Sequence, residues 1–201
     1  MFEKIKDYFR NYFKKKSLFS IITDVIFIVL VVLLIIPGTR KEVSALFIKL
    51  TSLPPSTLDK DEQYTIDART LQWNLTDLDG NTFTFGQMLD KPVLLNIWAT
   101  WCPPCIAELP GLIDLKNEYG NKANFLFVTD EPPGKVKAFL QKHGYPTNGF
   151  YLSQGVPADF ATRSIPASYI ISRDKRVVLK KKGAARWNSG TVKRLLDKLN
   201  E

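Results

Sequence analysis

The sequence predicts an α/β domain with a central mixed sheet covered by helices on both faces, preceded by one transmembrane helix. Two observations carry this prediction. Strand-patterned and helix-patterned segments alternate from residue 64 to the end of the chain, and a long apolar run stands before them. We therefore expect four parts: a basic cytoplasmic tail (1–16), a transmembrane anchor (17–37), an amphipathic and proline-rich tether (38–63) and the α/β domain (64–201).

Charge is unevenly distributed along the 201 residues. The chain carries a net charge of +8, of which the first 16 residues contribute +4. A basic chain of this kind could bind nucleic acid, but we find no recognised nucleic-acid motif in it. The basic excess is instead divided between the tail and the domain, and we expect no nucleic-acid partner.

The apolar run, "SLFSIITDVIFIVLVVLLII" at residues 17–36, contains a single charge, Asp24. Twenty helical residues at ~1.5 Å each extend ~30 Å, the thickness of the hydrocarbon core of a bilayer. A cleaved signal peptide would have a shorter apolar core followed by a small-x-small site, which "IIPGTRKEV" does not offer. We expect a retained, single-pass membrane anchor.

Basic residues at the start of this run predict its orientation. Lys14, Lys15 and Lys16 stand at its N-terminal edge, and positively charged segments stay in the cytoplasm. The N-terminus should therefore be cytoplasmic and the domain extracytoplasmic, on the periplasmic side of an inner membrane. The tether after the anchor combines a helical apolar spacing with the spacer-like stretch "SLPPSTLDKDEQ".

The domain itself reads as alternating strands and helices. A hairpin around Asp79–Gly80 opens it, and buried strands and amphipathic helices follow. The expected elements are the hairpin 71–85, a strand at 92–100, a helix from the cysteines to Tyr119, a strand at 124–129, a helix at 134–143, a strand at 149–153, a hairpin formed by 167–172 and 176–182, and a helix from Asn188 or Ser189 to about Leu199.

Cys102 and Cys105 are the only cysteines, in "ATWCPPCIAELP". A structural zinc site needs four ligands, and two cysteines with one histidine cannot supply them, so we expect no metal site. A permanent disulfide across two residues closes too short a loop to constrain the unfolded chain. Copper handling and a non-enzymatic tethered adaptor stay open as alternatives.

Redox chemistry fits the pair best. A thiolate at a helix N-terminus is stabilised by the helix dipole and free backbone N–H groups. The apolar strand before Cys102 would deliver this residue to that position as the exposed nucleophile, while Cys105, one turn further on, is shielded and resolves the mixed disulfide. A C-x-x-C next to a βαβ pattern is a strong signal of this chemistry. The redox-active disulfide itself would be the only cofactor.

The stretch "NIWATWCPPCIAELP" resembles the active site of the TlpA/ResA-like family, which are membrane-tethered extracytoplasmic thiol-disulfide oxidoreductases of the thioredoxin fold. The resemblance covers about residues 64–200 and includes an N-terminal β-hairpin extension. It implies that "SIPASYII" is the cis-proline loop, with Pro166 as the cis-proline and Ile165 offering backbone groups to the substrate chain. Trp101 would flank the Cys102 sulfur and shape the docking surface.

One position departs from the simple thioredoxin pattern. Asn96 stands six residues before Cys102, where thioredoxins carry a buried aspartate, and an amide cannot exchange protons. Glu108 follows Cys105 by three residues and so lies on the same helix face. The TlpA/ResA-like pattern also has an acid there, and we expect Glu108 to accept the Cys105 proton during resolution. The alternative is a glutamate that only complements the helix dipole.

The two prolines bear on the direction of electron flow. Pro103 and Pro104 have no N–H, so two donors that would stabilise the Cys102 thiolate are missing. A less stabilised dithiol means a lower potential, which favours a reductant of exported protein thiols that a membrane electron donor recharges. The resemblance points the same way, for example toward cytochrome c maturation. An oxidant, an isomerase or a thiol peroxidase of the same fold is the alternative.

Overall fold

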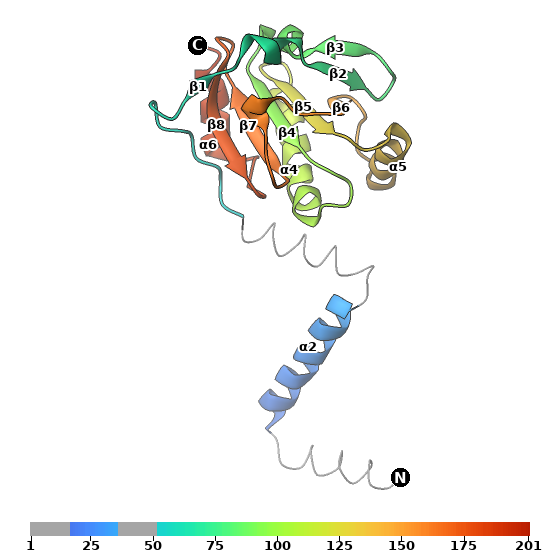
Figure 1. The fold of residues 1–201 in the computed structure, drawn as a ribbon. Helices are drawn as coiled ribbons and strands as arrows, with labels where there is room; N and C mark the ends of the chain where they lie inside the picture. Colours follow the sequence, from blue (N-terminus) through green and yellow to red (C-terminus); the bar gives the residue numbers. More distant parts are fainter. Residues whose placement is uncertain (1–16, 36–51) are drawn as a thin grey trace. The chain divides into compact units, whose positions relative to one another are not determined.

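The computed structural model describes residues 17–35 and 52–201 (Figure 1). These residues divide between two compact units, one containing the helix α2 and the other containing residues 52–201, and each is described by itself. The predicted basic tail at 1–16 and the first part of the predicted tether, up to residue 51, lie outside the described residues.

The helix α2 (Leu18–Ile35) covers most of the predicted anchor. It begins after Ser17, whose hydroxyl accepts a hydrogen bond from the Ser20 amide at 3.3 Å, as an N-terminal cap does. The predicted span extends to residue 37, and its last two residues lie outside the described ranges. Within the described parts of the chain, no helix has the combined length and apolar character of a membrane span.

The domain is built on one mixed sheet of eight strands in the order β1-β8-β7-β4-β5-β6-β2-β3. The strands β4, β5 and β6 are parallel, whereas β7 is antiparallel to both β4 and β8, and β2 pairs antiparallel with β3 and β6. The predicted mixed sheet and N-terminal hairpin are therefore confirmed. The strands are β1 (Tyr64–Thr65), β2 (Asn74–Asp77), β3 (Thr82–Thr84), β4 (Val93–Ile97), β5 (Asn124–Thr129), β6 (Phe150–Leu152), β7 (Ala167–Ile171) and β8 (Arg176–Lys182).

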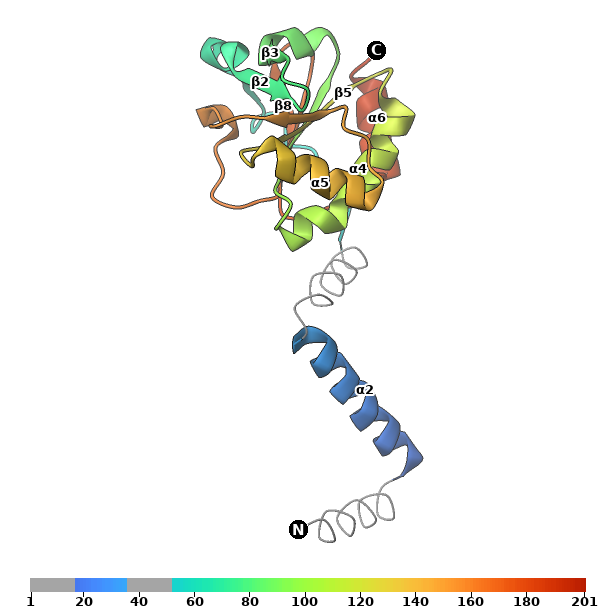
Figure 2. The same ribbon diagram turned by 90° about the vertical axis from the view of Figure 1, so that its right-hand side faces the viewer.

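Three α-helices cover one face of the sheet: α4 (Pro103–Tyr119), α5 (Pro133–His143) and α6 (Gly190–Lys198). All three bury apolar side chains in the same core cluster, represented by Leu112, Leu140 and Leu196. They lie together on one side of the strands in Figure 2. The predicted helices are thus present, and the N-terminal cap of α6 is Ser189, one of the two residues expected there.

Among residues 52–201, the helices on the opposite face are short 3-10 helices, η1 (Ala68–Gln72), η2 (Phe85–Asp90) and η3 (Ala158–Phe160). Phe85, Leu89 and Phe160 close the second core cluster on this face. Both faces therefore carry helices, as predicted, but α4, α5 and α6 all lie on the same face. Right-handed crossovers explain this, because β4-α4-β5 and β5-α5-β6 advance in the same direction across the sheet and so place both helices on one side.

Side-chain alternation along β4 brings a polar residue under α4. Leu94 packs in the cluster shared with the α-helices, and Leu95 and Ile97 pack in the other cluster. Because side chains alternate along a strand, Asn96 faces the same side as Leu94. It is 1% exposed and pairs in register with Ser168 of β7. This polar pair therefore lies beneath the helix that begins at the cysteines.

The last part of the predicted tether contacts the domain. The Leu58 amide donates to Val178 O at 2.9 Å, and the Arg186 amide donates to Leu53 O at 3.1 Å. Pro55 between them is buried. The boundary at residue 64 stays a prediction, but residues 53–58 do not form a free spacer. Its proline and charge content predict an extended segment. Its contacts with the domain could not be predicted locally, because they involve β8 and the residues after it, which are far away in the sequence.

Candidate active site

A disulfide joins Cys102 and Cys105 at the start of α4, with their Cα atoms 5.3 Å apart. Cys102 is the N-cap residue, and its Sγ accepts a hydrogen bond from the Cys105 amide at 3.3 Å. Pro103 and Pro104 fill the first two helical positions and have no N–H to offer. Cys105 therefore supplies the first amide of the helix that can reach this sulfur.

The loop before β7 lies against the disulfide. The peptide bond between Ile165 and Pro166 is cis, as predicted for this position. The carbonyl oxygen of Ile165 is 3.7 Å from Cys102 Sγ. The fold thus brings together the disulfide and the cis-proline loop, which are 63 residues apart in the chain and which the family resemblance implied to be neighbours.

The expected exposure of Cys102 is wrong for this disulfide-bonded state. Cys102 is 3% exposed and Cys105 is 2% exposed, so both are buried. The bonded sulfur of Cys105 and the carbonyl of Ile165 occupy the surroundings of Cys102 Sγ, whereas Trp101 before it is 58% exposed. Trp101 and Ile165, which are the neighbours of Cys102 in the chain and in space, both line a pocket of about 340 Å³, and neither cysteine is part of its lining.

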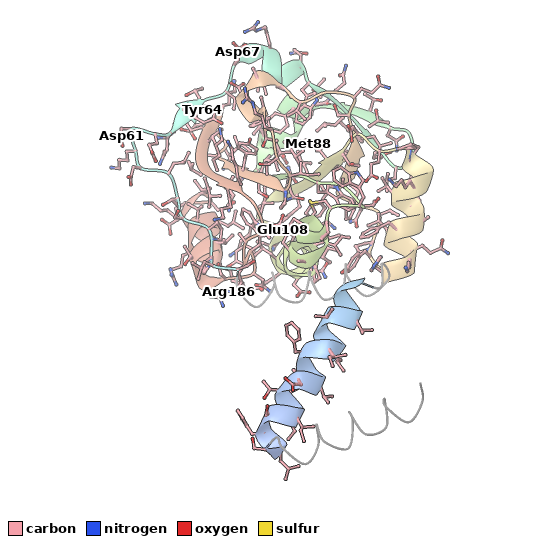
Figure 3. The ribbon with its side chains drawn as sticks, turned by 60° about the horizontal axis from the view of Figure 1, so that its bottom comes forward. Asp61, Tyr64, Asp67, Met88, Glu108 and Arg186 are labelled. Carbon is pink, nitrogen blue, oxygen red and sulfur yellow. A yellow bond between two sulfur atoms is a disulfide. The ribbon has the colours of Figure 1, made fainter. Side chains whose placement is uncertain are left out.

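Glu108 is buried on α4, inside the domain in Figure 3, and accepts three hydrogen bonds. Asn96 Nδ2 donates to its Oε1 at 2.8 Å. The Ala185 amide and Trp187 Nε1 both donate to its Oε2, at 3.0 and 2.9 Å. Asn96 and Glu108, predicted separately, are thus direct partners. Ala185 and Trp187 were missed, because they follow β8 and only the fold brings them to α4.

Burial raises the pKa of Glu108 to about 7, and the hydrogen bonds from Trp187, Ala185 and Asn96 limit that rise. The positive charge of Lys181 on β8 acts in the same direction as the hydrogen bonds. A carboxyl with a pKa near the operating pH can both take and release a proton, as a general base requires. Glu108 therefore has a pKa in the range that proton exchange near neutral pH requires, and its role toward Cys105 stays a prediction.

Glu131 is a second buried carboxylate at the site, and the sequence reasoning missed it. It accepts hydrogen bonds from the Thr100 amide at 2.5 Å and from the Thr100 hydroxyl at 2.9 Å. Lys135, in the first turn of α5, pairs with it at 2.5 Å. Glu131 thereby fixes the segment two residues before Cys102. The available signal was its place just after β5, since the carboxyl ends of the parallel strands β4 and β5 share one edge.

The site contains no evident place for a metal. Within residues 17–35 and 52–201, no three His, Cys, Asp or Glu side chains gather closely enough to hold a metal ion.

The chain is similar in sequence to bacterial proteins named as thioredoxin-like proteins or thiol-disulfide oxidoreductases. The chain is 31% identical over 103 residues to the thioredoxin-like protein YneN of Bacillus subtilis, and 31% identical over 108 residues to the thiol-disulfide oxidoreductase ResA of Bacillus thuringiensis. The matches cover 49% and 52% of this chain and 61% and 62% of those proteins. The chain therefore matches about three fifths of the length of these relatives.

Solved structures show the same fold. The structure of MTB DsbF in its mixed oxidised and reduced forms has a TM-score of 0.55 at 25% identity, over 67% of this chain and 99% of that one. A secreted Mycobacterium tuberculosis disulfide oxidoreductase homologous to E. coli DsbE has a TM-score of 0.51 at 24% identity, over 66% and 98%. These similarities establish the thioredoxin-like fold of the domain.

The model of the AhpC/TSA family matches residues 66–180, which is more than half of the chain and contains the disulfide, Glu108, Glu131 and the cis-proline loop. This protein is a member of the AhpC/TSA family, with a ResA-like thioredoxin fold.

Proposed function

We propose that this protein is a membrane-tethered, extracytoplasmic thiol-disulfide oxidoreductase that reduces exported proteins. The observation that carries the proposal is the Cys102–Cys105 disulfide at the N-terminus of α4, next to the cis Ile165–Pro166 bond. The relatives named as thiol-disulfide oxidoreductases support the same reaction class. Cytochrome c maturation is a setting in which such a reductant would act.

The reaction needs two exchanges between sulfur atoms. In the reduced protein the Cys102 thiolate attacks a client disulfide, a Cys102–client bond forms, and one client sulfur leaves as a thiolate. The Cys105 thiolate then attacks Cys102 Sγ, the internal disulfide forms, and the second client sulfur leaves. Two electrons pass to the client, and a membrane electron donor would return them.

Each remaining residue has a place in this scheme. Glu108 would take the proton from Cys105 before the second exchange, since its pKa lies near 7. Trp101 and Ile165 line the pocket beside Cys102, where the client chain would dock. The prolines limit the donors available to the Cys102 thiolate. No cofactor other than the disulfide is required.

Trapping tests the reaction class. In Cys105→Ala the first exchange can proceed and the second cannot, so Cys102 should accumulate mixed disulfides with clients. Dithiothreitol should release the trapped clients from Cys102, and mass spectrometry would then identify these proteins. Cys102→Ala is the matched control and should yield none. Equal amounts of adduct in the two variants would contradict the assignment of Cys102 as the nucleophile.

The reduction potential tests the direction. Because the thiolate lacks two amide donors, the disulfide should be difficult to reduce, with a potential well below the roughly −120 mV of a strong oxidant. Equilibration with defined thiol-disulfide buffers measures it. A potential near that of a strong oxidant would show that the protein supplies disulfides to its clients instead of removing them.

A further inference from the structure

In their present orientation, the hydrogen-bond partners of Glu108 match its ionised state and not its protonated state. An ionised carboxylate accepts hydrogen bonds and donates none, and Glu108 accepts three. A protonated carboxyl must also donate one. The Ala185 amide and the Trp187 indole carry only N–H donors on the side that faces Glu108, so neither can receive that hydrogen.

Asn96 is the exception among the three, because its side chain carries an oxygen as well as an NH₂ group. Its Nδ2 donates one hydrogen to Glu108 Oε1 and the other to Ser168 Oγ, each at 2.8 Å. A serine hydroxyl can accept or donate. Both groups that accept from Asn96 Nδ2 can therefore reverse their hydrogen-bond roles without moving.

We propose that a half-turn of the Asn96 side-chain amide accompanies each proton transfer to Glu108. The turn places Oδ1 where Nδ2 was. The oxygen has two lone pairs and accepts one hydrogen bond from the protonated Glu108 and one from the Ser168 hydroxyl. The reversal keeps all contacts of the carboxyl group satisfied in both states. Asn96 is thus a positioning residue, acting through Glu108.

This inference rests on the proposed function, in which the proton comes from Cys105. The thiol S–H bond breaks, the Glu108 O–H bond forms, and the electron pair stays on the sulfur that attacks Cys102. An aspartate at position 96 would bring a second carboxyl group to the same place. Asn96 instead offers an uncharged group that can match either state of Glu108, which accounts for an amide at this position.

Other charged groups lie near Glu108 and are part of its electrostatic environment. Lys181 on β8 lowers its pKa through its positive charge. Asp114 on α4 and Arg186 after β8 line a pocket of about 220 Å³ that Glu108 also lines. Among the three groups that donate to Glu108, only Asn96 can turn to offer an acceptor, and it lies at Oε1.

Nuclear magnetic resonance of the full chain in its disulfide-bonded form tests the proposal, because neither cysteine titrates in that form. The Glu108 carboxyl ¹³C shift should change with a midpoint near pH 7. The Asn96 side-chain amide should change with the same midpoint, and its NH₂ protons should be close to Glu108 only above that midpoint. An Asn96 amide that keeps this contact at every pH would overturn the proposal.

A matched pair of variants adds a second test. Ser168→Ala leaves one Asn96 N–H without an acceptor when Glu108 is ionised, whereas the turned amide oxygen still has its bond from Glu108. The midpoint of Glu108 should therefore shift to higher pH. Ser172→Ala, which removes another buried serine hydroxyl just after β7, should leave it unchanged. A downward shift or equal midpoints in the two variants would contradict the proposal.

Glu108→Gln separates this inference from the proposed function. A glutamine that donates toward Asn96 imitates the protonated carboxyl, so Asn96 should adopt the turned state at all pH values. If Asn96 turns with pH but the rate of thiol exchange has the same pH profile in Glu108→Gln, the amide reversal stands and the proton role of Glu108 fails. If Asn96 does not turn with pH but Glu108→Gln changes the pH profile of thiol exchange, the proton role of Glu108 stands and the amide reversal fails.

Discussion

At the scale of single residues, burial determines the pKa of Glu108. Its side chain lies beneath α4 with three N–H donors around it, and its pKa is raised from 4.5 to about 7. Desolvation disfavours the charged form, and the donors recover only part of that cost. The same burial that raises the pKa of Glu108 therefore makes the folded protein less stable when the carboxyl is ionised.

We expect this cost to appear in the pH dependence of stability. Because the folded-state pKa is raised, the folded protein binds more protons than the unfolded chain between about pH 4.5 and 7. The contribution of Glu108 is fully present below the lower value and is lost as pH rises through the higher one, by about 3 kcal/mol at most. Urea unfolding of the disulfide-bonded protein on either side of this window measures it.

Glu108→Gln should remove this part of the pH dependence, because an amide does not titrate. Glu118→Gln is a suitable control, since Glu118 is on the same helix and its carboxylate forms a surface pair with Lys193 at 2.6 Å. The control should keep the wild-type pH dependence. Loss of the same contribution in both variants would place its origin outside the buried carboxyl group.

At the scale of elements, the start of α4 depends on the loop after β5. Glu131 holds Thr100 through its backbone amide and its hydroxyl, and Lys135 of α5 neutralises the charge. Burial acts to raise the pKa of Glu131, but the hydrogen bonds from Lys135 and Thr100 outweigh it and lower the pKa. Its contribution to stability is therefore lost as pH falls through the lowered pKa, opposite in sign to that of Glu108.

Glu131→Gln should destabilise the protein by about 1–3 kcal/mol, because the amide has one acceptor oxygen in place of two and leaves a donor of the partly buried Thr100 unpaired. The rate of thiol exchange by Cys102 should fall with it, since Thr100 is two residues away. Glu118→Gln again serves as control and should cost less than about 1 kcal/mol, as exposed pairs do. Urea unfolding and stopped-flow reduction of a model disulfide provide the two measurements.

Local patterns predicted the elements of this site better than its contacts. Alternation and capping residues located β4, α4 and the closing hairpin, because these signals lie within a few residues. The burial of Cys102, the bonds of Glu108 to Trp187, and the bond of Glu131 to Thr100 depend on distant segments meeting in space. Glu108 was nonetheless identified from helical spacing, since its relation to Cys105 is local.

At the scale of the whole molecule, function depends on where the domain is located. The basic residues before the apolar run predict a cytoplasmic N-terminus, and the reductant role needs clients that are exported and oxidised. Residues 53–58 of the predicted tether contact the domain and do not form a free spacer. We therefore expect the domain to work on the extracytoplasmic side of the membrane.

Lysines at the two ends of the chain allow this orientation to be tested in one experiment. A membrane-impermeant amine reagent applied to spheroplasts should modify Lys180 to Lys182, and it should leave Lys14 to Lys16 unmodified, as peptide mass spectrometry would reveal. Inverted membrane vesicles should give the reverse pattern, because the tail is then outside. Detergent should expose both sets and serves as the control for reactivity. Modification of both sets in intact spheroplasts, or of the tail alone, would contradict the proposed anchoring and would remove the physical basis for exported clients.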